Sequence, residues 1–190
     1  QDTSSAASDV YKRQANIGYL IDQMSSVMIF VVCTISFFVH IYSTGYMTFD
    51  KDYSRFFSYI SFFTFAMLLL VMSDNFIQMF IGWEGVGLAS YLLIGFWHSK
   101  ASAISANLKA FLVNRIGDLF FIIGVVIIFS IFNSFNFSVI FNEINNLKDT
   151  NDLANLELAC LFLFIGAMAK SAQIPLHVWL PDSMEGPTPI

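Results

Sequence analysis

Long apolar stretches separated by short polar segments make up the chain after its first fourteen residues. A helix needs about 20 apolar residues to cross the hydrocarbon core of a bilayer, so each stretch is long enough for a membrane span and too long for a strand. Five spans are expected, at about 21–43, 56–73, 75–97, 108–133 and 154–180. The pattern therefore predicts an all-α fold, a polytopic transmembrane helix bundle.

The segments between the spans differ in length and in kind. Residues 73–75 form only a corner, which predicts an antiparallel hairpin of the second and third spans. Residues 134–152 are rich in Asn, Asp and Ser, which favours a surface loop. Pro175 and Pro181 interrupt the fifth span, and proline breaks the helical hydrogen-bond ladder. We therefore expect the last span to be discontinuous at Pro175, where it would line a cavity or be buried in protein.

Composition supports a membrane protein and excludes a nucleic-acid partner. Hydrophobic residues make up 56% and charged residues 12%, too little polar surface for a soluble globule. The net charge is −5, and no basic cluster is present to hold a phosphate backbone. Cys33 and Cys160 stand alone in apolar runs, which favours buried inert thiols over a disulfide or a metal site.

Charge in the connecting segments predicts the orientation in the membrane. If the first span begins on side X, the side Y segments hold Lys51, Arg55, Lys100 and Lys109, and side X holds only Lys148. By the positive-inside rule, side Y is the cytoplasmic or matrix face.

The two ends of the chain suggest a piece of a longer protein. Residues 4–14, SSAASDVYKRQ, can be encoded by DNA that resembles a common transposase library adapter, so residues 1–14 are expected to be a cloning or assembly scar. The chain stops directly after a Gly-Pro-Thr-Pro turn. We expect residues 15–190 to be a partial transmembrane domain.

Two ionisable residues lie deep in the apolar spans. Glu84 is about 14 Å along its helix from Asn75, and Lys170 about 18 Å from Leu158, both near the middle of a roughly 30 Å core. A charge at that depth costs about 2.5–3.5 kcal/mol on insertion scales and has a partner or a water-filled path. Burying both for packing alone would not repay their desolvation. Glu84 and Lys170 are therefore candidates for proton transfer.

The stretch NRIGD adds two more charges. Arg115 and Asp118 are three residues apart and share one helical face, as an ion pair can. They could complete a row of four ionisable side chains, or they could be a self-neutralised pair near a helix end; both readings stay open.

The remaining basic side chains are weaker candidates. Lys109 is expected to be a snorkelling interface lysine, and His40 a satisfied interfacial or core group. His177 stays open between a proton carrier and such a group.

Three small residues surround Glu84. Gly82, Gly85 and Gly87 form G-x-x-G-x-G, the reverse of the dinucleotide fingerprint, and no strand precedes them. They are expected to let neighbouring helices approach closely beside Glu84.

Three strings of the sequence are distinctive: SDNFIQMFIGWEGVGLASYLLIGFW, NRIGD and AKSAQIPLHVWLPDSMEGPTP. They resemble the chain 5 family of antiporter-like membrane subunits of proton-pumping NADH:ubiquinone oxidoreductase, respiratory complex I. The similarity runs from about Ile17 to Ile190. The antiporter-like component of multisubunit Na⁺/H⁺ antiporters is similar around AKSAQ and LPD, but NRIGD with MEGPTP fits the respiratory family better. Chains 2 and 4 of the same enzyme share the glutamate and lysine but lack MEGPTP.

The resemblance implies a role for each matched residue. Glu84 matches the glutamate that pairs with a pumping lysine, Lys170 matches that lysine on a discontinuous helix, and Arg115 and Asp118 match a charged helix motif between them. The resemblance also implies a multi-pass component of a translocase in the mitochondrial inner membrane, or alternatively the bacterial plasma membrane. Its partners would be the other membrane-arm subunits, especially the chain 4 subunit.

The expected mechanism is an electrostatic relay of protons. Moving the charge of Glu84 toward or away from Lys170 would switch the lysine between holding and releasing a proton. No cofactor is expected on this chain; NADH, FMN, iron–sulfur clusters and ubiquinone would belong to other subunits. The alternatives are a component of a Na⁺/H⁺ antiporter and a membrane scaffold without transport.

Overall fold

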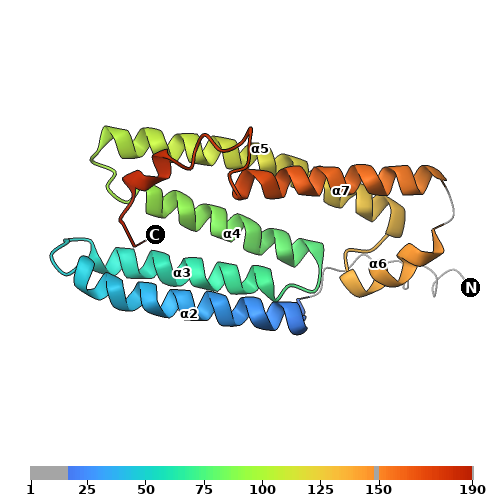
Figure 1. Ribbon diagram of the computed structural model, residues 1–190, viewed down its shortest axis with the longest axis horizontal. Coiled ribbons are helices and arrows are strands. Elements are labelled where there is room, and N and C mark those ends of the chain that lie inside the picture. Colours follow the sequence, from blue (N-terminus) through green and yellow to red (C-terminus); the bar gives the residue numbers. More distant parts are fainter. Residues whose placement is uncertain (1–16, 148–149, 190) are drawn as a thin grey trace, which may run out of the picture.

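The computed structural model describes residues 17–147 and 150–189, so the predicted scar at residues 1–14 lies outside the described residues. Five long helices alternate in direction and run side by side (Figure 1): α2 (Gln23–Tyr46), α3 (Tyr53–Val71), α4 (Phe76–Ile94), α5 (Ala101–Phe132) and α7 (Thr150–Lys170). All five are long and apolar enough to cross a bilayer. The predicted all-α bundle of five spans is confirmed.

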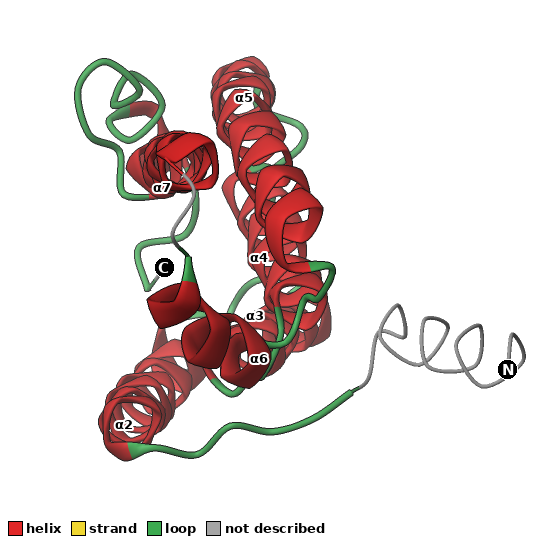
Figure 2. Ribbon diagram, turned by 90° about the vertical axis from the view of Figure 1, so that its right-hand side faces the viewer, coloured by secondary structure: helices red, strands yellow, loops and turns green. Residues whose placement is uncertain are grey.

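The helices form a row with two additions. Viewed along their axes, α3, α4 and α5 follow one another, α2 packs beside α3, and α7 packs beside α5 (Figure 2). In Figure 1 the α2–α3 turn, the α4–α5 connection and the residues after α7 share one end of the bundle. This end corresponds to side Y.

Short polar side chains fix where the spans begin. The Asp22 carboxylate accepts a hydrogen bond from Ser25 N, and the Ser25 hydroxyl accepts one from Asp22 N, both at 2.7 Å. Asn75 Oδ1 accepts a hydrogen bond from Gln78 N at 2.8 Å at the start of α4. Such caps satisfy amides that a helix leaves free. The short corner before Asn75 makes α3 and α4 the expected hairpin.

The connection predicted to be a surface loop contains helices, so that prediction is wrong in part. It includes α6 (Phe137–Glu143) and the 3₁₀ helix η1 (Ile144–Asn146). Ile140 is buried with Ile128 and Phe132, and the Phe137 ring lies 4.8 Å from that of Phe76. These spaced apolar residues give the segment a buried face despite its polar composition.

The fifth span is discontinuous, as predicted, but its helix ends at Lys170, before Pro175. Ala172 adopts the left-handed conformation with φ of 51°. The amides of Ala172 and Gln173 then bond back to the carbonyls of Ala169 and Met168, at 3.3 and 2.9 Å. This is the Schellman ending, here built on alanine instead of the usual glycine. Turns follow as far as the 3₁₀ helix η2 (Asp182–Glu185).

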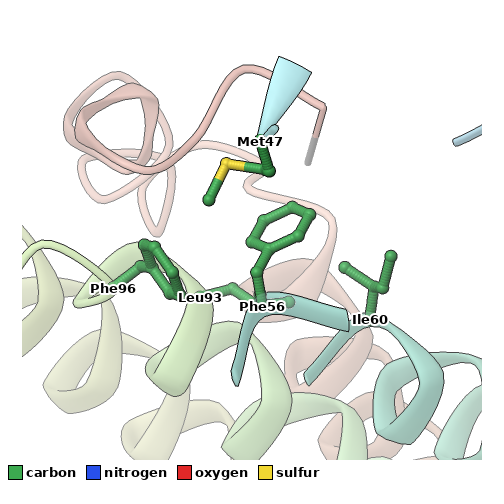
Figure 3. Close-up of a cluster of buried hydrophobic side chains, with 5 residues drawn as sticks. All are labelled: Met47, Phe56, Ile60, Leu93 and Phe96. Carbon is green, nitrogen blue, oxygen red and sulfur yellow. The ribbon is translucent and has the colours of Figure 1, made fainter. Parts of the chain in front are cut away.

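Glycines allow the close packing of α3 on α4. A Cβ on Gly82 would lie 2.6 Å from Leu70 N, and one on Gly85 would lie 2.9 Å from the Ala66 Cβ. The predicted close approach beside Glu84 is confirmed. Near side Y, the same helices enclose a hydrophobic cluster (Figure 3) of Met47, Phe56, Ile60, Leu93 and Phe96.

The two cysteines correct another expectation. Cys33 and Cys160 are free thiols, but both are exposed instead of buried. An apolar run in the sequence does not by itself bury each of its residues, because a helix in the run also has a face that no other helix covers.

Candidate functional site

Glu84 and Arg115 form an ion pair between α4 and α5. Arg115 Nη1 donates to Glu84 Oε1 at 2.6 Å. The guanidinium also lies over the Phe111 ring, 4.9 Å from its centroid. Glu84 is half-buried near the middle of α4, whereas about half of the Arg115 side chain is exposed. The arginine therefore joins the half-buried carboxylate to the outer surface of the helix pair.

Lys170 and Asp118 form a second ion pair, between α7 and α5. Lys170 Nζ lies 3.8 Å from Asp118 Oδ1, and their side chains are 19% and 5% exposed. The Trp83 indole donates to the same Asp118 oxygen at 2.7 Å, and Lys170 Nζ lies 5.8 Å from the Trp83 ring centroid. A buried carboxylate needs such partners, because desolvation otherwise penalises its charge.

The two pairs exchange the partners that the sequence suggested. From the sequence, Glu84 was expected to pair with Lys170, and a pair of Arg115 with Asp118 was one open reading. In the structure, Arg115 and Asp118 of α5 each pair with a residue of another helix. Arg115 and Asp118 lie on successive turns of α5 and so hold the two pairs next to each other. The cluster alternates in charge and sums to zero. We call these four residues the charged cluster.

Small residues let Lys170 reach this position. A Cβ on Gly87 would lie 2.6 Å from Lys170 Nζ, so the ammonium occupies the space above that glycine on α4. A Cβ on Gly117 of α5 would collide with the Ala169 side chain, the residue before Lys170. The end of α7 is thereby held against the middle of α5, and the Lys170 side chain reaches α4.

A small cavity of about 40 Å³ borders the charged cluster, whose four residues are all among its lining. Asn114 also lines it, and its buried Oδ1 accepts no hydrogen bond from the described residues. Such a volume holds a few water molecules. A larger cavity of about 370 Å³ lies toward side Y and shares Tyr91 with the small one. The two cavities are therefore neighbours along α4.

The weaker candidates lie outside the charged cluster. His177 is exposed in the turns after α7. Lys109 pairs with Asp182 on side Y, and His40 bonds to the Ser36 carbonyl at 2.7 Å within α2. Among the described residues, no group of three or more His, Cys, Asp or Glu side chains could hold a metal ion.

Sequence reasoning missed the polar neutral residues of the site. Trp83 adjoins Glu84 in sequence, and a tryptophan N–H inside a span needs an acceptor, which was a usable signal. Asn114 adjoins Arg115 and carries the same signal for an amide. Trp179 lies within the span predicted at 154–180 and carries the same signal as Trp83; its indole donates to the Ala169 carbonyl at 3.0 Å.

The family models and the known proteins that this chain resembles point to the same family. Residues 73–190 match the family model described as NADH:quinone oxidoreductase/Mrp antiporter, TM, and residues 9–57 match the chain 5 N-terminus model of NADH-ubiquinone oxidoreductase (complex I). The chain is 52% identical over 184 residues to NADH-quinone oxidoreductase subunit L of Neisseria meningitidis serogroup A, covering 92% of this chain and 27% of that protein. It is 52% identical over 176 residues to NADH-ubiquinone oxidoreductase chain 5 of Metridium senile, covering 93% and 29%.

A solved structure shares the fold. The Mrp complex from Dietzia sp. DQ12-45-1b superposes with a TM-score of 0.80 at 25% sequence identity, over 90% of this chain and 18% of the matched chain. The chain spans about a quarter of the length of the curated relatives it matches. With the first family model covering more than half of its residues, the chain belongs to the NADH:quinone oxidoreductase/Mrp antiporter family of membrane proteins.

Proposed function

We propose that the chain is part of a proton-translocating membrane subunit of NADH:ubiquinone oxidoreductase, chain 5 of respiratory complex I, and that the charged cluster relays protons. The observation that carries the proposal is the meeting of four alternating charges from three helices beside a water-sized cavity. Ionisable groups at membrane depth mark ion pathways by default. The relatives named NADH-quinone oxidoreductase subunit L and NADH-ubiquinone oxidoreductase chain 5, and the family model that names complex I, support the assembly to which the relay would belong.

In this proposal Lys170 is the group that holds and releases the proton. Asp118, fixed by the Trp83 indole, stabilises the ammonium form. The Glu84–Arg115 pair lies one helical turn away and biases that balance through its own charge separation. Water in the cavity, bonded to the free Asn114 oxygen, would carry protons to and from the lysine.

The relay only moves protons between ionisable groups and water and transfers no electrons, so its energy must come from redox chemistry elsewhere. NADH, FMN, the iron–sulfur clusters and ubiquinone would be held by other subunits of the complex. The partners would be neighbouring membrane-arm subunits, especially the chain 4 antiporter-like subunit. The location would be the mitochondrial inner membrane or, alternatively, a bacterial plasma membrane.

The test is Lys170→Met in the full-length protein within its assembled complex. Methionine keeps the length of the side chain but removes the amine, so proton translocation should fall at least about tenfold while assembly persists. The measurements are protons moved per NADH oxidised in sealed vesicles and the abundance of the intact complex. A normal proton-to-electron ratio would remove Lys170 from the mechanism and favour a scaffold without transport.

A second candidate, a component of a Na⁺/H⁺ antiporter, is favoured by the fold shared with the Mrp complex. The 52% identity to NADH-quinone oxidoreductase subunits favours the first proposal. The two are separated by rotenone-sensitive NADH oxidation in native membranes, with this chain migrating in a very large complex. Sodium-dependent proton exchange without NADH oxidation would support the antiporter.

A further inference from the structure

The end of α7 is tied by a residue that the relay does not use. A helix leaves its last four carbonyls without partners inside the helix. In α7 the nearby amides of residues 171–173 supply partners, and in addition the Trp179 indole donates to the Ala169 carbonyl at 3.0 Å. Ala169 is buried and immediately precedes Lys170. A side chain ten residues away thus reaches back to the peptide that carries the lysine.

The indole itself is held by the other two helices of the site. Trp179 packs against Ile94 of α4 and against Ala106 and Ala110 of α5. Two alanines one turn apart leave room on α5 for the large ring. The indole therefore links the helices that bear Glu84 and Asp118 to the end of the helix that bears Lys170.

The residues after Trp179 are fastened to the same helix. Lys109 pairs with Asp182, and the Ser102 hydroxyl donates to Glu185 at 3.1 Å, so η2 is joined to the first turns of α5. These contacts keep the turn segment from moving away from α5 and carrying the indole with it.

We infer that Trp179 is a positioning residue, which sets the distance between the Lys170 ammonium and the Asp118 carboxylate by fixing the end of α7. This inference rests on the proposed function. A helix end frays readily, and a lysine there has several rotatable bonds. With the Ala169 carbonyl bonded to a ring that α4 and α5 hold, the backbone at Lys170 keeps its place relative to Asp118, and the relay keeps its geometry.

The test is Trp179→Phe in the full-length protein within the assembled complex, which keeps the aromatic packing and removes the N–H. The matched control is Trp97→Phe. Trp97 also lies on side Y and donates to a carboxylate oxygen, Asp50 Oδ2, at 3.1 Å, but it is remote from Lys170. We expect roughly a fivefold slower proton translocation for Trp179→Phe and less than about twofold for the control.

A double-mutant cycle separates positioning from general support of the fold. In an Asp118→Asn background, Trp179→Phe should slow translocation by less than about twofold further, because the Lys170–Asp118 ion pair whose distance Trp179 sets is already lost. Two substitutions that act independently would instead slow translocation additively in free energy. Equal slowing in both backgrounds, or a Trp179→Phe complex that pumps like the Trp97→Phe control, would overturn the inference.

A second variant decides the question if Trp179→Phe fails to assemble. Asp182→Asn loosens η2 from Lys109 but keeps the Trp179 indole and its N–H, so it should give a smaller loss with the same dependence on Asp118. Additive slowing with Asp118→Asn would then overturn the inference. If the proposed function itself is wrong, the Lys170→Met variant will pump normally. That result is distinct from the outcomes that would overturn the inference about Trp179.

Discussion

Two regions of the described residues place polar side chains among apolar helices, and each region satisfies them differently. Between α2 and α3 the groups are neutral and bond over short distances: the Ser36 and Thr64 hydroxyls lie 2.7 Å apart, and His40 bonds to the Ser36 carbonyl. Among α4, α5 and α7 the groups are charged, and each ion pair joins two different helices. Only the second region places full charges beside a cavity.

The difference separates two uses of polarity in a membrane protein. Neutral hydrogen bonds between membrane helices contribute about 0.6 kcal/mol on average, which suits packing. A buried ion pair seldom repays its desolvation, so stability alone does not account for the buried Lys170–Asp118 pair. Substitutions in the first region should therefore act on stability, and substitutions in the second on transport.

After Lys170→Met, the largest expected loss of transport comes from removing the Glu84 charge. Glu84→Gln keeps the shape but leaves Arg115 without its carboxylate, so NADH oxidation coupled to pumping should slow on the order of tenfold. Glu84→Asp should retain part of the rate. Because Glu84 and Arg115 act as a pair, the double variant Glu84→Gln, Arg115→Gln should be no slower than the worse single variant.

The matched control for these variants is Glu157→Gln, which removes an exposed carboxylate of α7 outside the charged cluster. It should leave the rate unchanged. The measurement is coupled NADH oxidation per assembled complex in sealed membranes. Equal rates for Glu84→Gln and Glu84→Asp would mean that shape, and not charge, matters at this position.

Two glycines of α4 provide a smaller and more selective test. A Cβ at position 87 meets only the mobile Lys170 ammonium, so Gly87→Ala should assemble and slow transport about two- to fivefold by displacing the charge. A Cβ at position 82 meets the Leu70 backbone, which cannot give way, so Gly82→Ala should destabilise the α3–α4 contact by about 1–3 kcal/mol.

Abundance of the intact complex and turnover per complex distinguish the two effects. Gly82→Ala should lower the abundance of the intact complex, and Gly87→Ala should lower the turnover per complex. Loss of assembly with both variants would show that position 87, too, serves packing and not the lysine.

The sequence sufficed for the number and approximate position of the spans, because these depend on local hydropathy and helical rise. It did not suffice for the pairing within the charged cluster. Which residue of α5 meets Glu84 depends on how α4, α5 and α7 are rotated about their axes, and tertiary packing decides that rotation.

Two further misses have local causes. The sequence attributed the end of the fifth span to Pro175, but the turn depends on Ala172 in a left-handed conformation that alanine seldom adopts. Residues 137–143 were predicted to be loop from their composition, although Phe137 and Ile140 are spaced to pack one helical face. In both places the contacts of neighbouring helices override the average preference of the residue.

The smallest expected effect belongs to His40, an ionisable side chain in an apolar span outside the charged cluster. Its Nδ1 bonds to the Ser36 carbonyl, which can only accept, so this nitrogen carries a proton; its Nε2 can then accept from the Ser61 hydroxyl, 3.4 Å away. A neutral ring thus satisfies both contacts, and no carboxylate takes part in them.

His40→Gln should change proton translocation less than twofold and lower the free energy of unfolding by about 0.6 kcal/mol. Thr64→Val, which removes the neighbouring hydroxyl pair, should have the same small effect. The measurements are translocation in vesicles and thermal unfolding in detergent, and a tenfold loss of translocation with His40→Gln alone would place a proton carrier in the α2–α3 region and erase the contrast between the two regions.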